Sequence, residues 1–304
     1  MNLDPDQLEA LAAAVSEGTF DAAARALHVT PSAVSQRLKA LETSVGQVLL
    51  TRSKPVRATT SGETLLRAAR QIQAVSADAL RELGAGDAGE GPSVVALAVN
   101  ADSLDTWFLA ALAEPGVLAE PGGLDGLDSA VFDLRREDET RTAELLRRGE
   151  VIAAVTTSRN PVPGCAVRRL GRMRYAPRAS AAFRAQWFPD GVTAAALSRA
   201  PVVLFDRDDT IQERYLRRRV RRPLHPPRHY IPESGPYFQA VRLGLGWGMI
   251  PDLQLARDTG ADLVDLDPAG EIDVELYWQQ WRVAGPTLER VARAVQATAA
   301  QFLR

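Results

Sequence analysis

The stretch Thr30–Glu42, with the sequence TPSAVSQRLKALE, decides the fold of the N-terminal region. Thr30 can cap a helix, and Pro31 fits the first helical position because no N–H is needed there. Apolar side chains recur at helical spacing on one face: Val34, Leu38 and Leu41. Side chains that can form hydrogen bonds lie on the opposite face: Ser32, Ser35, Gln36 and Lys39. Such a helix can read base edges or phosphates, and the alternative is a three-helix scaffold with an ordinary polar surface.

Two shorter helices are predicted before this one. The first begins at Asp4-Pro5, which offers a cap followed by proline, and its apolar face consists of Leu8, Leu11, Ala12 and Val15. Gly18 ends this helix, and Thr19 can cap the next. The apolar face of the second helix consists of Phe20, Ala23, Ala24 and Leu27.

The composition is that of a globular protein of about two domains. The chain has 304 residues, of which 46% are hydrophobic and 24% charged, and its net charge is −2. No run longer than 11 residues lacks a charged side chain, so no membrane-spanning helix is expected. The start, MNLDPDQLEA, lacks the features of a secretory signal, and the single Cys165 cannot form an internal disulfide. We therefore expect a cytoplasmic protein.

Positive charge is concentrated near the N-terminus. From Arg25 to Arg70, eight Lys or Arg side chains stand against two acids, Glu42 and Glu63, so this segment carries a charge of +6. A basic patch in a neutral chain is typical of a DNA-binding module, although many solvated faces have a similar composition.

The segment from Phe20 to Glu42 closely resembles the winged helix-turn-helix of LysR-type transcriptional regulators. The segments Val45-Gly46, Leu49–Arg52 and Thr59–Gly62 are similar to that family's wing and its exit. The resemblance implies that the third helix lies at the major groove and that the wing meets phosphates or the adjacent minor groove. His28 is expected to be a structural residue of the turn. The expected DNA-contacting residues are Thr30, Pro31, Ser32, Ser35, Gln36, Arg37, Lys39, Arg52, Lys54 and Arg57.

One long helix is predicted from Ser61 to Leu83. Its apolar residues alternate at spacings of three and four, which makes a narrow seam suited to pairing with another helix. The alternative is packing on its own domain. The resemblance favours the linker helix through which two LysR-type subunits dimerise, followed by a Gly-rich hinge at 84–93.

From residue 94 onward, short apolar runs alternate with helical stretches. The first set of expected elements is Val94–Val99, Leu104–Leu112, Val131–Leu134, Thr140–Arg147 and Val151–Val155. The second set is Val202–Phe205, Ile211–Arg218, Tyr237–Leu243, Trp247–Ile250 and Leu253–Arg257. This alternation predicts two α/β lobes on a largely parallel sheet. The expected fold class is therefore α+β multidomain, with an N-terminal winged helix-turn-helix, a long linker helix and two α/β lobes of periplasmic-binding-protein-like architecture.

Polar side chains follow three of the predicted strands, at Asn100–Ser103, Thr156–Ser158 and Asp206–Asp209. Ligands of α/β folds bind at the carboxyl ends of strands. Hydroxyls and helix N-terminal amides suit a carboxylate, and carboxylates suit an ammonium or guanidinium group. One pocket that offers both predicts a cationic amino acid as ligand, whereas Asp102 or Asp208 alone would be a simple helix cap.

Further segments resemble the ArgP/LysG branch of the family. They are Val99–Leu104, Thr106-Trp107, Glu137–Thr142, Leu146–Val151, Trp187–Thr193, Ala200–Asp206 and Tyr277-Trp278. Regulators of this branch sense lysine, arginine or histidine and control genes such as a LysE-type exporter. The polar residues after the strands, taken together with this resemblance, give an expected effector site of Asn100, Asp102, Ser103, Thr106, Trp107, Thr156, Asp206 and Ser234.

Within this site, Asp102 and Asp206 are expected at the cationic end of the effector. The amino-acid head group is expected at three hydroxyls: Ser103, Thr106 and Thr156. Two segments depart from the branch: Glu114–Ser129 is longer and richer in Gly and Pro, and Glu233–Pro236 replaces an expected Ser-Ser-Glu.

An enzyme is the first alternative class. Gly244–Gly248 has the composition of a nucleotide-binding loop but follows a helical pattern, so close helix-to-strand packing is favoured. His225 and His229 have no Cys or acidic cluster beside them, and Cys165 has no evident activating base. No enzyme activity, cofactor or metal is therefore expected. The basic run Arg217–Arg222 is expected to be a solvated helix end, with DNA or inter-subunit contacts as the alternative.

These features predict a regulator that forms a homodimer or homotetramer and binds double-stranded DNA, RNA polymerase and a basic amino acid, with no membrane partner. The hypothesis is that the amino acid closes a cleft and thereby changes the angle between paired DNA-binding domains. The alternatives are a LysR-type regulator of another small molecule and a cytoplasmic solute-binding protein. The expected divisions are 1–60 for the winged helix-turn-helix, 61–83 for the linker, 84–93 for the hinge, 94–164 with 268–304 for lobe I, and 165–267 for lobe II.

Overall fold

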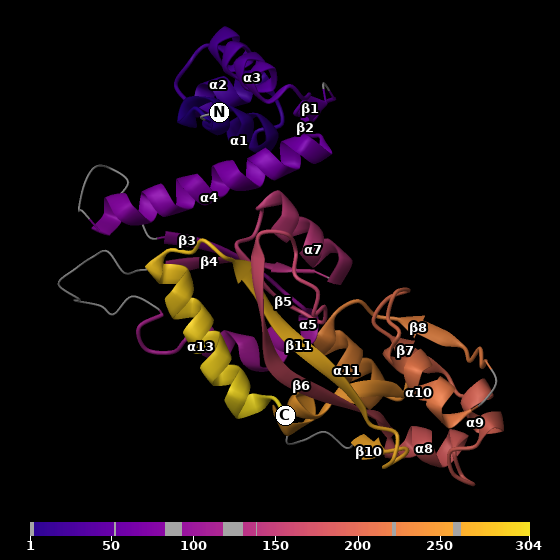
Figure 1. The fold of residues 1–304 in the computed structure, drawn as a ribbon. Helices are drawn as coiled ribbons and strands as arrows, with labels where there is room; N and C mark the ends of the chain where they lie inside the picture. The colour runs from indigo at the N-terminus through magenta and orange to yellow at the C-terminus, as the bar shows by residue number, and fades with distance from the viewer. Residues whose placement is uncertain are drawn as a thin grey trace.

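A three-helix domain, one long helix and a larger domain built around a single sheet make up the chain (Figure 1). The structure is a computed structural model that describes residues 3–51, 53–82, 93–117, 130–137, 139–220, 223–257 and 263–304. Of the expected hinge at 84–93, residues 84–92 lie outside these described residues and Ser93 begins a strand; Arg52 and the greater part of Glu114–Ser129 also lie outside them.

The first three helices follow the predicted caps. They are α1 (Pro5–Ser16), α2 (Phe20–Ala26) and α3 (Pro31–Val45). Each begins at a side-chain oxygen that accepts a backbone N–H within the first turn: Asp4 from Asp6 at 2.9 Å, Thr19 from Ala22 at 3.2 Å and Thr30 from Ala33 at 3.2 Å. His28 adopts a positive φ of 53° in the turn between α2 and α3, so the prediction of a turn residue is confirmed.

A short antiparallel pair, β1 (Leu50–Thr51) and β2 (Arg57–Ala58), follows the three helices as the expected wing. The Glu42 side chain ties this wing to the end of α3, because its Oε1 accepts the Leu49 N–H at 2.8 Å. Leu49 itself is fully buried in the core of the helical domain, which fixes the wing on the helices.

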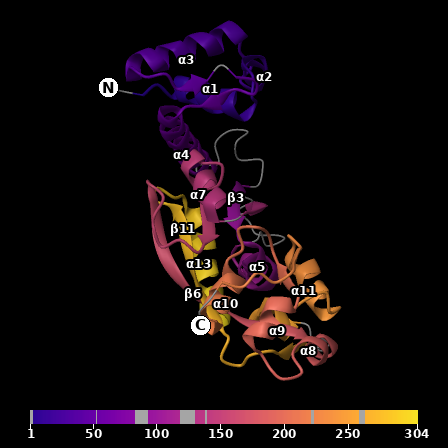
Figure 2. The same cartoon turned by 90° about the vertical axis from the view of Figure 1, so that its right-hand side faces the viewer.

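The long helix α4 (Thr60–Glu82) matches the predicted linker. Leu66 and Ala69 pack into the core of the three-helix domain, so part of the helix packs on its own domain, as the alternative held. Farther along, apolar side chains on α4 are exposed: Ile72, Val75 and Leu80. The larger domain contacts α4 through α7 (Glu139–Arg148), as Figure 2 shows.

Seven described strands form the sheet of the larger domain: β3 (Ser93–Val99), β4 (Ala130–Arg136), β5 (Ala153–Thr156), β6 (Cys165–Ser180), β9 (Gly248–Pro251), β10 (Leu263–Asp265) and β11 (Ile272–Trp281). Their order is β10-β6-β11-β5-β3-β4, with β9 also on β6. β3 pairs in parallel with β4 and β5, whereas β6 and β11 are antiparallel to all their neighbours. The prediction of a largely parallel sheet is therefore wrong. The chain leaves along β6 and returns along β11, and these two long strands dominate the pairing.

Helices and a second small sheet surround these strands. The helical elements are α5 (Ala101–Ser103), the π-helical turn η2 (Leu104–Phe108), α6 (Leu109–Leu112), α8 (Ala181–Trp187), α9 (Ala194–Arg199), α10 (Ile211–Arg219), α11 (Ser234–Arg242), α12 (Asp252–Arg257) and α13 (Pro286–Phe302). β7 (Val202–Leu204) pairs in parallel with β8 (Arg228–Tyr230). The predicted helix Leu104–Leu112 thus contains a π-helical turn.

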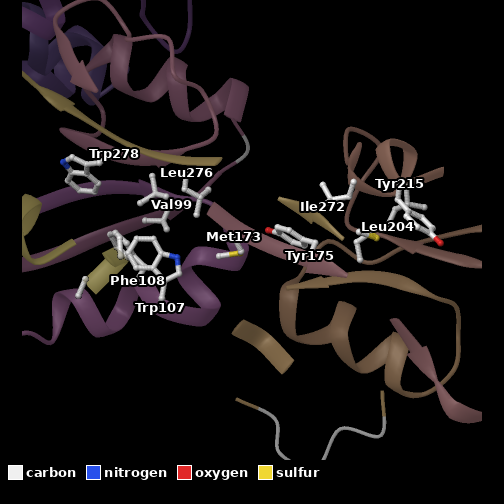
Figure 3. Close-up of a cluster of buried hydrophobic side chains, with 14 of the residues drawn as sticks. Val99, Trp107, Phe108, Met173, Tyr175, Leu204, Tyr215, Ile272, Leu276 and Trp278 are labelled. Atoms are coloured by element: carbon white, nitrogen blue, oxygen red, sulfur yellow. The ribbon is translucent and has the colours of Figure 1, made fainter. Parts of the chain in front are cut away.

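One continuous hydrophobic core links the two ends of the larger domain (Figure 3). Trp107 and Trp278 lie at one end, Leu204 and Tyr215 lie at the other, and Met173 of β6 lies between them. The paired strands β6 and β11 run along this core from one end to the other, so they connect the two sets of elements.

Glycine permits a close approach between α11 and β9. A Cβ on Gly248 would lie 2.5 Å from the Tyr237 hydroxyl and 2.8 Å from a Val241 methyl, so a side chain there would force the helix away. This confirms helix-to-strand packing, and not nucleotide binding, as the role of this part of Gly244–Gly248.

The other singled-out residues have structural surroundings. Cys165 is buried, and burial raises the pKa of its thiol to about 11. The described arginines of the basic run have partners near α10: Arg217 pairs with Glu213, Arg218 donates to the Glu271 carbonyl and Arg219 pairs with Asp267. Within the described ranges, no helix is long and apolar enough to cross a membrane.

Candidate functional site

The exposed face of α3 carries the first candidate site. The helix buries Val34, Leu38 and Leu41, as its spacing predicts. Its polar residues Ser32, Ser35, Gln36 and Lys39 are exposed, together with Pro31 at its first position. Short hydroxyl and amide side chains beside a lysine are suited to base edges and phosphates.

Two of the predicted DNA-contacting residues already have partners within the domain. The Arg37 guanidinium lies 2.6 Å from the Asp6 carboxylate of α1, and its side chain is 28% exposed. Thr30 uses its hydroxyl as the cap of α3. Lys54 and Arg57 are exposed on the wing, while Arg52 lies outside the described residues.

A cavity of about 410 Å³ in the larger domain is the second candidate site. Its walls come from the ends of β3 and β4, from β6, β9 and β11, from the loop after β7 and from α11. Both predicted lobes therefore contribute to it. The polar lining residues are Asn100, Asp102, Arg136, Glu137, Thr157, Tyr175, Asp206, Asp208, Asp209, Thr210, Gln212 and Tyr237.

Three of the eight predicted effector residues line this cavity: Asn100, Asp102 and Asp206. Five do not belong to the lining: Ser103, Thr106, Trp107, Thr156 and Ser234.

Local hydrogen bonds or burial describe four of those five positions. The Thr106 hydroxyl donates to the Asp102 carbonyl one turn back at 2.5 Å, and the Thr156 hydroxyl accepts the Ser158 N–H at 3.2 Å. Trp107 and Ser103 are fully buried. Ser103, Thr106 and Thr156, the residues expected at the head group, thus lie outside the lining of this cavity.

Ser234 acts on the cavity through Asp102. Its hydroxyl donates to Asp102 Oδ1 at 2.6 Å, and the Tyr175 hydroxyl donates to Asp102 Oδ2 at 2.6 Å. Burial raises the pKa of Asp102, and these two hydrogen bonds oppose that shift. Burial and the neighbouring Asp102 raise the pKa of Tyr175 far above its usual value, so Tyr175 stays a donor.

A second carboxylate, Asp209, lies across the cavity wall in the loop after β7. Its oxygens accept the backbone N–H groups of Phe205 at 3.0 Å and Ile211 at 3.1 Å. Burial raises the pKa of Asp209 as well, and these backbone hydrogen bonds oppose the shift. Asp206 shapes the same loop, because its Oδ1 accepts two backbone N–H groups at 2.8 Å, from Asp208 and from Asp209.

The sequence reasoning missed several lining residues. Tyr175 lies in β6, a strand that no apolar run had revealed, and Tyr237 lies on α11, which reasoning about strand ends does not reach. Asp209 was present in the stretch Asp206–Asp209 but was not selected. The signal that could have found it is its place as the last of four polar residues after a buried strand.

The lining of the cavity is predominantly negative. Its ionisable residues include five carboxylates, Asp102, Glu137, Asp206, Asp208 and Asp209, and one arginine, Arg136. Glu137 is paired with Arg141 at 2.9 Å, which leaves the four aspartates to face the cavity. Two of these, Asp102 and Asp209, bear raised pKa values because a charge there is poorly solvated. A cationic group in the cavity would relieve that cost.

Comparison with known proteins decides the family. Residues 5–63 match the bacterial regulatory helix-turn-helix protein, lysR family, and residues 129–300 match the LysR substrate binding domain. The chain belongs to the LysR family. It is a transcriptional regulator with a helix-turn-helix and not an enzyme, in agreement with the prediction.

Two LysR-family relatives, LysG and ArgP, cover almost the whole chain, and LysG does so both by sequence and by solved structure. The lysine export transcriptional regulatory protein LysG of Corynebacterium glutamicum is 41% identical over 99% of this chain and 100% of its own. The crystal structure of ArgP from Mycobacterium tuberculosis has a TM-score of 0.89 at 45% identity, covering 100% of this chain and 99% of that one. Full-length LysG from C. glutamicum with bound effector Arg has a TM-score of 0.82 at 37% identity, covering 99% of both chains. The predicted resemblance to the ArgP/LysG branch is confirmed.

Proposed function

We propose that this LysR-family regulator takes a basic amino acid, lysine or arginine, as its effector. The proposal rests on the cavity between the two sets of elements. Four aspartates and one arginine, Arg136, line this cavity, and the fifth carboxylate, Glu137, is paired with Arg141. A cationic side chain gains charge-assisted hydrogen bonds there, whereas an acidic or apolar one does not. The LysG relative with bound arginine supports the same effector class.

The regulated gene is proposed to encode a LysE-type exporter of basic amino acids. The name of the C. glutamicum relative, a lysine export regulator, supports this choice. The proposed partners are double-stranded DNA, RNA polymerase and a second copy of the chain, in the cytoplasm. The second copy would cover the apolar side chains of α4, Ile72, Val75 and Leu80, which are exposed in the single chain.

DNA contact is proposed for the exposed face of α3 and for the wing. Ser32, Ser35 and Gln36 would read base edges, and Lys39, Lys54 and Arg57 would meet phosphates. Arg37 is proposed to position α3 on α1 through Asp6, since its guanidinium is already paired. The divisions 1–60, 61–83 and 94–304 are retained as proposed functional units.

The proposed mechanism is a change in the relative stability of open and closed forms of the larger domain. An effector shifts such an equilibrium only by its differential affinity for the two forms. Asp102 can sense the effector and also depends on the closed form. It lines the cavity from α5, and its Oδ1 accepts a hydrogen bond from Ser234 of α11. Effector charge at Asp102 therefore acts on a hydrogen bond between the two lobes.

A thermal-shift screen against all twenty amino acids tests the proposal. An effector at about 100 times its Kd adds roughly 2.7 kcal/mol to the free energy of unfolding. We expect lysine, arginine or histidine alone to raise the midpoint. A response only to acidic or aromatic amino acids would refute the basic effector and would favour a regulator of another small molecule.

Two matched variants locate the site. Asp206→Asn keeps an acceptor for the loop N–H groups but removes the charge, so the affinity for arginine should fall about tenfold or more. Asp190→Asn removes an exposed charge outside the cavity and should leave the affinity unchanged. Equal affinities in both variants would remove Asp206 from the site.

A further inference from the structure

We propose that Arg136 receives the α-carboxylate of the effector, so that the cavity distinguishes basic amino acids from the amines left by their decarboxylation. This inference rests on the proposed function and names the chemical class within it. It replaces the hydroxyls Ser103, Thr106 and Thr156, none of which lines the cavity.

The charges around the cavity match an amino acid better than a simple cation. Arg136 is the one Lys or Arg among the lining residues of the described chain, against five carboxylates. At neutral pH arginine and lysine each carry two positive groups and one negative group. In a site for a diamine the guanidinium of Arg136 would be unfavourable, because it repels both positive charges of the ligand.

The two poles of the cavity differ in exposure. The oxygens of Asp102 accept hydrogen bonds from two buried residues, Tyr175 and Ser234, which are 4% and 6% exposed, so Asp102 forms the inner pole. The Arg136 side chain is 38% exposed and ends β4 at the outer part of the lining. A ligand whose side-chain cation points inward would therefore present its α-carboxylate toward Arg136.

The guanidinium of Arg136 is held in place by residues of the second set of elements. Its Nη1 donates to the Pro232 carbonyl at 2.8 Å, and its Nη2 lies 3.3 Å from Glu233 Oε1. Its central carbon lies 5.7 Å from the centre of the Phe205 ring. A guanidinium has five N–H donors, so these contacts leave donors for a carboxylate in a fixed plane.

The alternative role for Arg136 is purely structural: it could act as a strut, a contact that holds the two lobes together. Its partners Pro232, Glu233 and Phe205 belong to the second set of elements, while β4 belongs to the first. A strut would stabilise the closed form whatever ligand fills the cavity. A carboxylate receptor would favour only ligands that carry the carboxylate, and this difference separates the two roles.

The test compares arginine with agmatine, which has the same guanidinium and amine but no carboxylate, by calorimetric titration of the full-length protein. Agmatine carries one more net positive charge, so a negative cavity without a carboxylate receptor should bind it more tightly than arginine. With Arg136 as receptor, we expect arginine to bind roughly ten- to a hundredfold more tightly, the range of charge-assisted hydrogen bonds.

Arg136→Gln should lower the affinity for arginine by that factor and should leave the affinity for agmatine unchanged or raise it. The affinity of Arg136→Lys for arginine should fall between those of the native protein and Arg136→Gln. Arg135→Gln is the matched control: it removes the neighbouring charge on β4, which pairs with Glu150 outside the cavity lining, and should leave the ratio unchanged. Equal weakening of both ligands by Arg136→Gln, or tighter binding of agmatine by the native protein, overturns the inference while the basic effector stands. Native protein that binds neither ligand overturns the proposed function and the inference together.

Discussion

Effector binding should release protons from the cavity, because two of its carboxylates have pKa values that burial raises. Asp102 and Asp209 hold protons to a higher pH in the empty protein than free aspartates do. A guanidinium or ammonium group beside them favours the charged form and lowers both pKa values. The affinity for arginine should therefore rise with pH across the interval between the pKa values of the filled and the empty cavity.

The magnitude follows from the number of carboxylates involved. Each carboxylate that loses a full proton on binding adds one tenfold gain in affinity per pH unit, or about 1.36 kcal/mol. The limit is therefore a slope of one for Asp102 alone and of two if Asp209 contributes equally. The charge pair is strong enough to drive this release, since two unit charges at 4 Å attract by about 4 kcal/mol at an effective dielectric constant of about 20.

The sign can be checked at both ends of the interval. Well below pH 3.8, the usual pKa of an aspartate, both carboxylates are protonated in the empty protein. Above their raised pKa values both are already ionised, and the affinity no longer changes with pH. The free energy of unfolding of the empty protein should also fall as pH rises from 3.8, the usual pKa of an aspartate, through the raised pKa values of Asp102 and Asp209, because the folded state holds these protons to a higher pH than the unfolded chain does.

Titration calorimetry in two buffers of different ionisation enthalpy counts the released protons directly. Asp102→Asn should reduce the count to the share of Asp209, and Asp209→Asn should do the converse. A heat of binding that is the same in both buffers throughout the acidic range would refute the reasoning, since it would mean that no proton leaves with the effector's arrival.

Three further outcomes test other parts of the molecule. Thr30→Ala should lower the free energy of unfolding by about 1 kcal/mol in chemical denaturation, because it removes the cap of α3, and Thr30→Ser should restore it. Arg57→Gln should reduce the slope of log affinity for duplex DNA against log salt by about 0.9, the value of one phosphate contact, whereas an unaltered slope places Arg57 away from the DNA. Glu63→Gln should break the ion pair at 3.1 Å to Arg148 and weaken the effect of arginine on DNA binding, while arginine affinity itself, measured by calorimetry, stays the same.

The N-terminal domain was readable from its sequence because its signals are local. Capping residues, helix-breaking glycine and apolar spacing act within one or two helical turns, and Thr19 and Thr30 take the predicted roles. Strand β6 has no such local signal in its sequence, because its pairing partners are distant along the chain. Its sixteen residues, CAVRRLGRMRYAPRAS, contain five arginines, because much of one face is in contact with solvent and acidic neighbours. A search for apolar runs passes over such a strand, and the predicted sheet became parallel as a result.

The cavity was predictable in its charge but not in its geometry. Polar residues after strands pointed to Asp102 and Asp206, and both line it. Tyr175 and Arg136 were out of reach, since their roles depend on which strand ends meet across the two sets of elements. Thr106 shows what spacing alone does not reveal, because its hydroxyl donates to the carbonyl of Asp102 one turn back.

One helix, α7, lies between the cavity and the long helix α4, and this arrangement gives the Glu63→Gln prediction its force. Glu137 lines the cavity just before α7 begins, and Arg148 at the other end pairs with Glu63 of α4. The Arg148 carbonyl also accepts a hydrogen bond from Arg70 at 2.6 Å, and Arg70 in turn reaches Ser16 of α1 at 3.1 Å. Ten residues of helix span about 15 Å and bend little, so movement at the cavity edge has a stiff connection to the DNA-binding domain. Contact alone does not establish coupling, whereas loss of the arginine response with effector binding intact would.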